Sequence, residues 1–245
     1  MSQPYDQIKA VNQSTLKILL TKSPAHYLYA TDNPSPDTPA LVIGRAVHSL
    51  VLEPHTFPDL YITSPFDSFR TKEAKEWRDR QTAAVLSQGD LATVHTMAQA
   101  VLALPQMKDW LGDYQREVTK TWEYRNIACK GRFDMLSPGG THVVDIKTCA
   151  DASPKAFARS AVNFGYDFQG AFYSLPTDAN RVTFVCVEKE FPHVTGVYTL
   201  SPCFLALGRA KVDRAIDILQ ACRVNFQFPG YGEQTLEVPA WAENS

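Results

Sequence analysis

The stretch GRFDMLSPGGTHVVDIKT, residues 131–148, decides the fold of this chain. On either side of SPGG, apolar residues alternate in twos, which predicts two antiparallel strands joined by a turn. A symmetric turn would pair Leu136 with Thr141 and Asp134 with Val143. These strands are apolar enough to be buried, yet they carry two carboxylates and an ammonium, groups that are costly to bury unless they are paired.

Paired side chains across a hairpin share a face, and successive side chains alternate between faces. The assumed turn therefore puts Asp134, Val143, Asp145 and Lys147 on one face. The residues of the other face form the predicted core side: Phe133, Met135, Val144 and Ile146. Asp134 and Asp145 become diagonal neighbours, with backbones about 7–8 Å apart. From that distance their side chains can share a cation such as magnesium, whose oxygen ligands lie at about 2.0–2.1 Å.

Lys147 follows Asp145 by two residues, on the same face. Its ammonium can neutralise the carboxylates, or orient water and stabilise charge on a phosphate when a metal is bound. The carbonyl of Ile146, between the two, is a further candidate ligand. On the D-x-K spacing alone, a surface ion-pair cluster is the better interpretation, because the tripeptide is common.

Other residues fit the same site. Gln169 and Tyr173 are spaced i, i+4 and share a helix face, so either could contact a phosphate. Taken by itself, Tyr173 is more simply interpreted as a residue that packs and bonds inward. His48 lies in an apolar helical stretch, where a core role is the usual one, but its imidazole could complete a carboxylate metal site. Glu123 is a weaker candidate, and an exposed strand charge is its simpler interpretation.

The periodicity along the chain predicts an α/β (α+β) fold with a central mixed β-sheet flanked by helices. Residues 1–112 show helical spacing, including a charged amphipathic helix over SFRTKEAKEWRDRQTAAVLSQ. Residues 113–228 hold a three-strand meander, two short helices, two more strands and a long helix. Residues 229–245 form a polar tail, predicted to be mobile. We expect a single domain over 1–245.

Composition sets limits on the class of protein. The net charge of −2 gives no whole-molecule attraction to nucleic acid or to an anionic membrane, although a local basic groove remains possible. The sequence has no apolar run of about 20 residues and no signal-peptide pattern, so we expect a cytoplasmic protein without a membrane partner. Its five cysteines are scattered without C-x-x-C, which argues against a zinc or redox motif and favours reduced core thiols.

The combination of GRAVHSLVLEP, GRFDML, DIKT and GYDFQGAFY resembles the PD-(D/E)XK nuclease superfamily. Within it, the chain is most similar to the exonuclease VIII (RecE) type of phages and prophages, from about Asn12 to the last helix. The resemblance implies a restriction-endonuclease-like core with a helical N-terminal region. Phe133 stands where the family name expects Pro, and Asp145 where many members have Glu; both variants keep the metal carboxylates.

By this resemblance, His48, Asp134 and Asp145 correspond to metal ligands, Lys147 to the catalytic lysine, and Gln169 with Tyr173 to the Q-x-x-x-Y element. The resemblance implies a Mg²⁺-dependent exonuclease, with Mn²⁺ as a substitute. Such an enzyme degrades linear double-stranded DNA 5′ to 3′ and leaves 3′ single-stranded tails for a RecT-type annealing protein. It also implies a homo-oligomer and a phage or prophage origin, with action in the bacterial cytoplasm.

Two alternatives stay open. A different nuclease on the same site, an endonuclease or a single-strand exonuclease, is compatible with the residues, because polarity depends on the shape of the channel. A catalytically silent DNA-binding domain is disfavoured, since it predicts the loss of at least one site residue. For DNA contacts, Arg70 and Lys72 are the candidates, because they precede the acidic residues of their helix.

Overall fold

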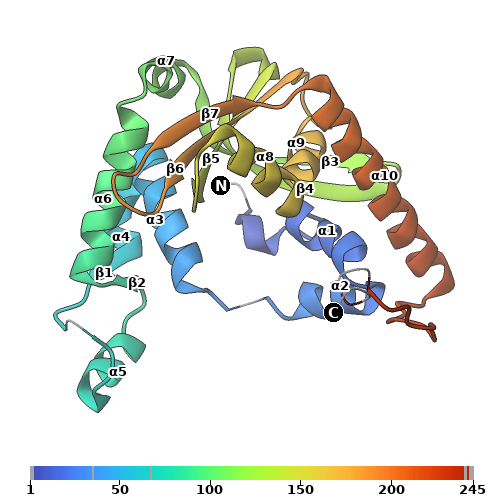
Figure 1. Ribbon diagram of the computed structural model, residues 1–245, viewed down its shortest axis with the longest axis horizontal. Helices are drawn as coiled ribbons and strands as arrows, with labels where there is room; N and C mark the ends of the chain where they lie inside the picture. Colours follow the sequence, from blue (N-terminus) through green and yellow to red (C-terminus); the bar gives the residue numbers. More distant parts are fainter. Residues whose placement is uncertain (1–2, 35, 67, 240–241, 243–245) are drawn as a thin grey trace.

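The computed structural model describes residues 3–34, 36–66, 68–239 and 242 (Figure 1). The helices that precede the main sheet are α1 (Gln13–Thr21), α2 (Pro24–Asp32), α3 (Pro39–Leu52), α4 (Phe57–Leu60), α5 (Lys72–Asp79), α6 (Gln88–Leu102) and α7 (Pro105–Asp113). The strands of the main sheet are β3 (Gln115–Tyr124), β4 (Ile127–Leu136), β5 (His142–Cys149), β6 (Arg181–Glu188) and β7 (Thr195–Thr199). The later helices are α8 (Pro154–Asn163), α9 (Tyr166–Tyr173) and α10 (Pro202–Asn225).

Several helices begin at capping residues or at proline, which sets their bounds. The side chain of Asn12 accepts the backbone N–H of Thr15 at 2.9 Å, and Ser201 caps α10 in the same way. Pro105 separates α6 from α7, as expected for a residue that cannot continue a helix. Ser153 precedes α8 but its side chain makes no capping bond.

The main sheet has the order β3-β4-β5-β6-β7 and is mixed, which confirms the predicted fold class. All neighbouring strands are antiparallel except β5 and β6, which are parallel because α8 and α9 cross between them. Helices cover both faces of the sheet (Figure 1): α1, α8, α9 and α10 on one side, α3, α6 and α7 on the other.

Each face has its own hydrophobic cluster. The α9-side cluster includes fully buried aromatic side chains from sheet and helices: Phe133, Phe168, Phe172 and Phe184. The α3-side cluster includes Val47, Met97, Met135, Val144 and Ile146. Burying a side chain of this size contributes about 1.5–3 kcal/mol relative to leaving it exposed. Helix α3 buries only its inner stripe, since Leu41 is 55% exposed, so it is amphipathic rather than buried throughout.

The predicted hairpin register is wrong by two residues. Leu136 pairs with Val143, not with Thr141, and Met135 pairs with Val144. The connection between the paired residues therefore spans residues 137–142 instead of the predicted 137–140. It contains two glycines with positive φ, Gly139 and Gly140. A shift of two keeps each β5 side chain on its predicted face, whereas a shift of one would have reversed it.

The prediction that Phe133 and Met135 share a face is also wrong. Phe133 belongs to the α9-side cluster and Met135 to the α3-side cluster, so the alternation breaks between them, at Asp134. The face predicted for the acidic residues is not a solvated one, because Val143 on it is buried in the α9-side cluster. Both sheet faces are therefore core.

The charged helix is shorter than predicted. It ends at Asp79, and the following residues form β2 (Ala84–Leu86), which pairs in parallel with β1 (Tyr61–Thr63). This small sheet has only three residues per strand, too few for a periodic signal. Of the five cysteines, Cys203 is exposed and the other four are buried, so the core prediction fails for Cys203.

The predicted tail is partly described. Residues 229–239 have no helix or strand, but the carbonyl of Pro229 accepts the N–H of Ala25 at 3.1 Å. The prediction of a mobile tail also covers 240–241 and 243–245, which lie outside the described residues. Within the described part of the chain, no helix has the length and apolar character needed to cross a membrane.

Candidate active site

The candidate site lies where β4 and β5 separate. Their ladder consists of Met135–Val144 and Leu136–Val143, and the same register would next bring Asp134 opposite Asp145. Instead of a backbone pair, the side chain of Asp134 bridges the strands: its Oδ2 accepts the backbone N–H of Ile146 at 2.7 Å. The carboxylate of Asp134 thus takes the place of a backbone carbonyl of β4 as the acceptor of the Ile146 N–H.

Beyond this point, β4 finds another partner. Val11 forms a parallel bridge with Cys129, in which Val11 donates to the carbonyl of Ala128 at 2.9 Å and accepts from the N–H of Lys130 at 2.8 Å. The N-terminal segment therefore pairs with part of the β4 edge that β5 has left, and it satisfies the carbonyl of Ala128 and the N–H of Lys130 there.

Strand β3 is irregular at the same level. It pairs with β4 through Arg116–Met135 and Val118–Phe133, but no pair joins Glu117 to Asp134. Glu117 has φ +52°, a left-handed conformation that is uncommon for a residue other than glycine. Glu117 and Asp134 thus lie side by side on neighbouring strands, each at an irregular position of its strand. Both carboxylates point toward His48.

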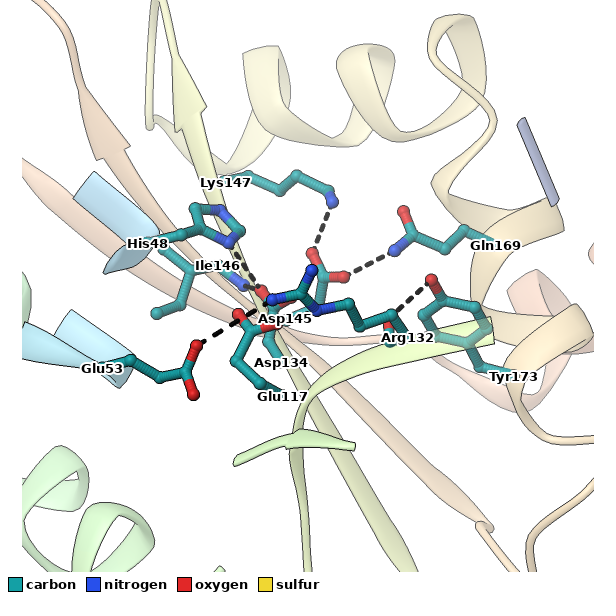
Figure 2. Close-up of polar contacts among 10 residues, drawn as sticks. All are labelled: His48, Glu53, Glu117, Arg132, Asp134, Asp145, Ile146, Lys147, Gln169 and Tyr173. Carbon is teal, nitrogen blue, oxygen red and sulfur yellow. Dashed lines mark hydrogen bonds and ion pairs between the residues drawn. The ribbon is translucent and has the colours of Figure 1, made fainter. Parts of the chain in front are cut away.

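His48 reaches this region from α3 (Figure 2). Its Nδ1 lies 3.3 Å from Oδ2 of Asp134. One ligand atom each from His48, Glu117 and Asp134 lie within 4.8 Å of one another. The three donors come from three different elements, α3, β3 and β4.

Asp145 and Lys147 complete the site from β5 (Figure 2). Nζ of Lys147 lies 2.5 Å from Oδ2 of Asp145, and Nε2 of Gln169 on α9 donates to Oδ1 at 2.5 Å. Both oxygens of Asp145 therefore face positively polarised groups. The ammonium of Lys147 also lies over the ring of Tyr166, 5.3 Å from its centroid.

The charges of the site act on one another strongly. Burial, together with the charge of Asp134, raises the pKa of Asp145 to about 6. Burial acts to raise the pKa of Asp134 as well, but His48, Lys147 and the Ile146 amide together hold it below its usual range. Burial acts to lower the pKa of His48, yet the two aspartates raise it.

The donor set fits a divalent cation. Burial and the charge of Asp134 raise the pKa of Glu117, as they do for Asp145. Two of the three carboxylates are therefore harder to ionise than usual, first because they are buried and second because they lie near the charge of Asp134. Carboxylate oxygens with one imidazole nitrogen suit Mg²⁺ or Mn²⁺ better than a softer metal.

The structure brings together most of the predicted site residues. His48 contacts Asp134, and Lys147 and Gln169 contact Asp145, while the backbone N–H of Ile146 joins Asp134 to β5. Asp145 does not belong to the set of three residues, His48, Glu117 and Asp134, whose ligand atoms lie within 4.8 Å of one another. Tyr173 turns inward, is 7% exposed, and donates to the carbonyl of Arg132 at 2.9 Å, which agrees with the packing interpretation. Glu123 is an exposed strand residue, as its simpler interpretation predicted.

Arg70 and Lys72 do not join the site. Lys72 is the first residue of α5 and Arg70 lies just before that helix, which Figure 1 shows standing away from the main sheet. Lys72 is 90% exposed as a side chain and pairs with Glu76 at 3.6 Å. Their proposed contact with DNA remains a prediction.

Sequence reasoning missed Glu117 and Arg132. Their side chains form an ion pair beside Asp134, and Nη2 of Arg132 lies 3.9 Å from Oε2 of Glu53. The alternation of β3 gives no sign that Glu117 turns toward the site, because the positive φ at that residue interrupts the period. No sequence signal would have separated Glu117 from Glu123.

Comparisons with known proteins agree with this geometry. Over its whole length, the chain superposes on a protein from Eubacterium rectale described as a candidate exonuclease, with 13% identity, a TM-score of 0.69 and 98% of that chain covered. At this identity the likeness concerns the fold alone. None of the curated proteins compared with the sequence matches it significantly.

Two other solved structures match at lower scores. A phage-related exonuclease from Haemophilus somnus 129PT has 12% identity and a TM-score of 0.42, with 91% of this chain and 100% of that chain covered. LHK-Exo from Laribacter hongkongensis, in complex with dAMP, has 14% identity and a TM-score of 0.40, with 89% and 93% covered. At such scores these two superpositions carry no argument.

Residues 12–237 match the family described as a PDDEXK-like domain of unknown function (DUF3799). The match spans most of the chain and includes every residue of the candidate site. It agrees with the mixed sheet flanked by helices. The chain therefore belongs to this PDDEXK-like family, and its fold is that of the PD-(D/E)XK nucleases.

Proposed function

We propose that this protein is a metal-dependent exodeoxyribonuclease that degrades linear double-stranded DNA from its 5′ ends. The observation that supports the proposal most directly is the meeting of His48, Asp134, Asp145 and Lys147 at the separation of β4 and β5. Family membership supports a nuclease, and the resemblance to exonuclease VIII supports the choice of substrate and polarity.

His48, Asp134, Asp145 and the carbonyl of Ile146 would hold the Mg²⁺ ion. When bound, the ion supplies charge neutralisation at the scissile phosphate and lowers the pKa of an attacking water. Asp134 is held in place for this role by the Ile146 amide, and Asp145 by Gln169, so neither carboxylate depends on the ion for its orientation.

Lys147 is proposed to stabilise negative charge on the phosphate and to orient water. Burial acts to lower the pKa of Lys147, but the nearby charges of Asp145 and Asp134 raise it, so the ammonium stays protonated in the site without an ion. Its hydrogen atoms are therefore available as donors. The rings of Tyr166 and Phe184, 5.3 and 5.8 Å from Nζ, restrict where the ammonium can move.

Gln169 and Tyr173 are proposed to act from α9 in different ways. Gln169 fixes the side chain of Asp145 and is close enough to the site to contact a phosphate. Tyr173 ties α9 to β4 through the carbonyl of Arg132, and so positions the strand that carries Asp134.

The wider function is proposed from the resemblance. The 3′ single-stranded tails left by the enzyme would serve recombination by strand annealing with a RecT-type protein, and the enzyme would act as a homo-oligomer. Arg70 and Lys72, both exposed, are proposed to contact phosphates. If so, replacing both by Ala should reduce the dependence of DNA binding on salt concentration.

The deciding assay uses linear duplexes labelled separately at each 5′ and 3′ end, with chelator-treated protein and added Mg²⁺. We expect early release of the 5′ label as short products, no turnover without Mg²⁺, and survival of a covalently closed circle. Asp145→Asn should be inactive, whereas Asp109→Asn, a change of the same kind at an exposed position of α7, should be fully active.

The same assay separates the alternatives. Early loss of the 3′ label, or linearisation of the closed circle, would replace the proposal with another nuclease on this site. Binding of duplex without any cleavage over a range of Mg²⁺ and Mn²⁺ concentrations would indicate a silent DNA-binding domain.

A further inference from the structure

The ion pair between Glu117 and Arg132 lies at the edge of the candidate metal site. Nε of Arg132 forms an ion pair with Oε2 of Glu117, whose side chain is only 13% exposed. The same carboxylate group lies within 4.8 Å of ligand atoms of His48 and Asp134. Glu117 is therefore shared between a guanidinium on one side and the metal donors on the other.

We propose that Glu117 is an additional ligand of the divalent cation, and that cation binding frees Arg132 to contact a phosphate of the DNA. The inference rests on the proposed function, since it assigns two more residues of the same chain to the same site. It differs from the predicted ligand set, which included neither Glu117 nor Arg132.

The geometry favours an exchange of partners over a fixed structural ion pair. Arg132 is 51% exposed as a side chain, and its second contact, to Glu53, is long at 3.9 Å, so among the described residues the ion pair with Glu117 is the closest one that holds the guanidinium. A cation bound by Glu117 would repel the guanidinium and compete for the same carboxylate. The long, exposed side chain of Arg132 can then leave without disturbing the fold.

The freed guanidinium has a place to act. A cavity of about 410 Å³ adjoins the site and is lined by Arg132 together with Arg45, Tyr61, Glu117 and Asp134. The proposed metal donors His48, Glu117 and Asp134 line this same cavity, so a DNA phosphate that approaches the cation would enter the space that Arg132 also lines. Guanidinium groups suit phosphate oxygens because their donors form a planar fork. Figure 2 shows the side chain of Arg132 extended toward Glu53 and Glu117.

Binding of the cation can be measured without turnover. Mn²⁺ is titrated calorimetrically into chelator-treated protein without DNA, for the wild type, Glu117→Gln and Arg132→Met. Glu117→Gln should weaken Mn²⁺ binding at least about tenfold, since even outer-shell losses typically cost ~10–100-fold. Arg132→Met should tighten binding, by about fivefold, because a competing charge is removed. Arg116→Met, which removes an exposed charge from the same strand as Glu117, should change little.

Binding of DNA gives the second measurement. In Ca²⁺, which should support little cleavage, Arg132→Met should bind a blunt duplex more weakly, with a salt slope smaller by about 1. Unchanged Mn²⁺ affinity in Glu117→Gln, weaker or unchanged Mn²⁺ affinity in Arg132→Met, or unchanged duplex binding in Arg132→Met would each overturn the inference. Cleavage of end-labelled duplex by the wild type tests the proposed function separately, so the two failures are distinguishable.

Discussion

The carboxylate of Asp134 accepts the backbone N–H of Ile146 at 2.7 Å, and this bond joins β4 to β5 just where their backbone ladder ends. The same oxygen, Oδ2, lies 3.3 Å from Nδ1 of His48. One side chain thus holds the two strands together at their separation and also presents charge to the proposed metal site. Its two roles can be separated by choosing the replacement.

Asp134→Asn should abolish cleavage and keep most of the stability. The amide oxygen can still accept the N–H of Ile146, but the negative charge is lost. Asp134→Ala should abolish cleavage too and destabilise the protein further, by about 1–3 kcal/mol, because a buried N–H loses its acceptor. Denaturant unfolding and initial cleavage rates at saturating Mg²⁺ measure the two effects. A near-normal rate for Asp134→Asn would remove this residue from the ligand set.

His48→Ala tests whether the imidazole is a ligand or a core residue. The side chain is 25% exposed and lines the cavity beside the site, where water can fill the space it leaves, so we expect the melting temperature to change little. As a ligand, its loss should raise the Mg²⁺ concentration needed for half-maximal cleavage, or silence the enzyme. A clear drop in melting temperature with normal activity per folded molecule would show that His48 is a core histidine.

His142 predicts loss of stability in acid. This side chain is 5% exposed, and its two ring nitrogens lie 2.9 Å from the hydroxyl of Tyr114 and 2.8 Å from the hydroxyl of Thr183. Burial lowers the pKa of His142 to about 4, and the nearby charge of Arg181 acts in the same direction. Because the folded pKa lies below the unfolded value near 6.5, the unfolded chain takes up the proton first. Stability should therefore be complete above about pH 6.5 and fall toward pH 4, by up to about 3 kcal/mol from this residue.

His142→Gln provides the comparison. Glutamine cannot titrate, so the free energy of unfolding of this variant should fall less steeply between pH 6.5 and 4 than that of the wild type. The absolute stability of the variant at neutral pH is irrelevant to the test, since only the slope is compared. Equal slopes for the two proteins would show that another group controls the acid transition.

The sequence predicts the main elements because their signals are local. Capping residues such as Asn12 and Ser201, and the change of period near residue 113, depend on neighbours within a few positions. The small sheet of β1 and β2 was missed because three-residue strands carry no period. The hairpin register was missed because the turn uses two consecutive positive-φ glycines, Gly139 and Gly140, which sequence alone does not distinguish from a shorter turn.

The site could be predicted only in part. The D-x-K pattern with Asp134, and the resemblance to a known family, indicated the side chains that the structure brings together. Glu117 and Arg132 depend on a break in strand alternation, and such a break follows from tertiary packing rather than from a residue pattern. The bridge from Asp134 to the backbone of Ile146 could not be predicted either, because it requires the separation of β4 and β5.

Gly208→Ala should disturb the site from a distance. Gly208 lies on α10, where a Cβ atom would come 2.0 Å from the carbonyl oxygen of Asp167 at the start of α9. Lys211 also pairs with Asp167 at 2.5 Å, so α9 and α10 are held in close contact. The added methyl must push α9 away, which should cost at least about 1–3 kcal/mol of stability and displace Gln169 from Asp145, lowering the cleavage rate.

Gly112→Ala is the matched control for this prediction. Gly112 lies on α7 and a Cβ atom there would meet no atom within 4 Å, so alanine should be neutral or stabilise the helix by up to about 1 kcal/mol. Urea unfolding and initial cleavage rates of both variants decide the matter. If Gly208→Ala unfolds at the wild-type urea concentration and cleaves at the wild-type rate, then close contact between α9 and α10 is not what positions Gln169.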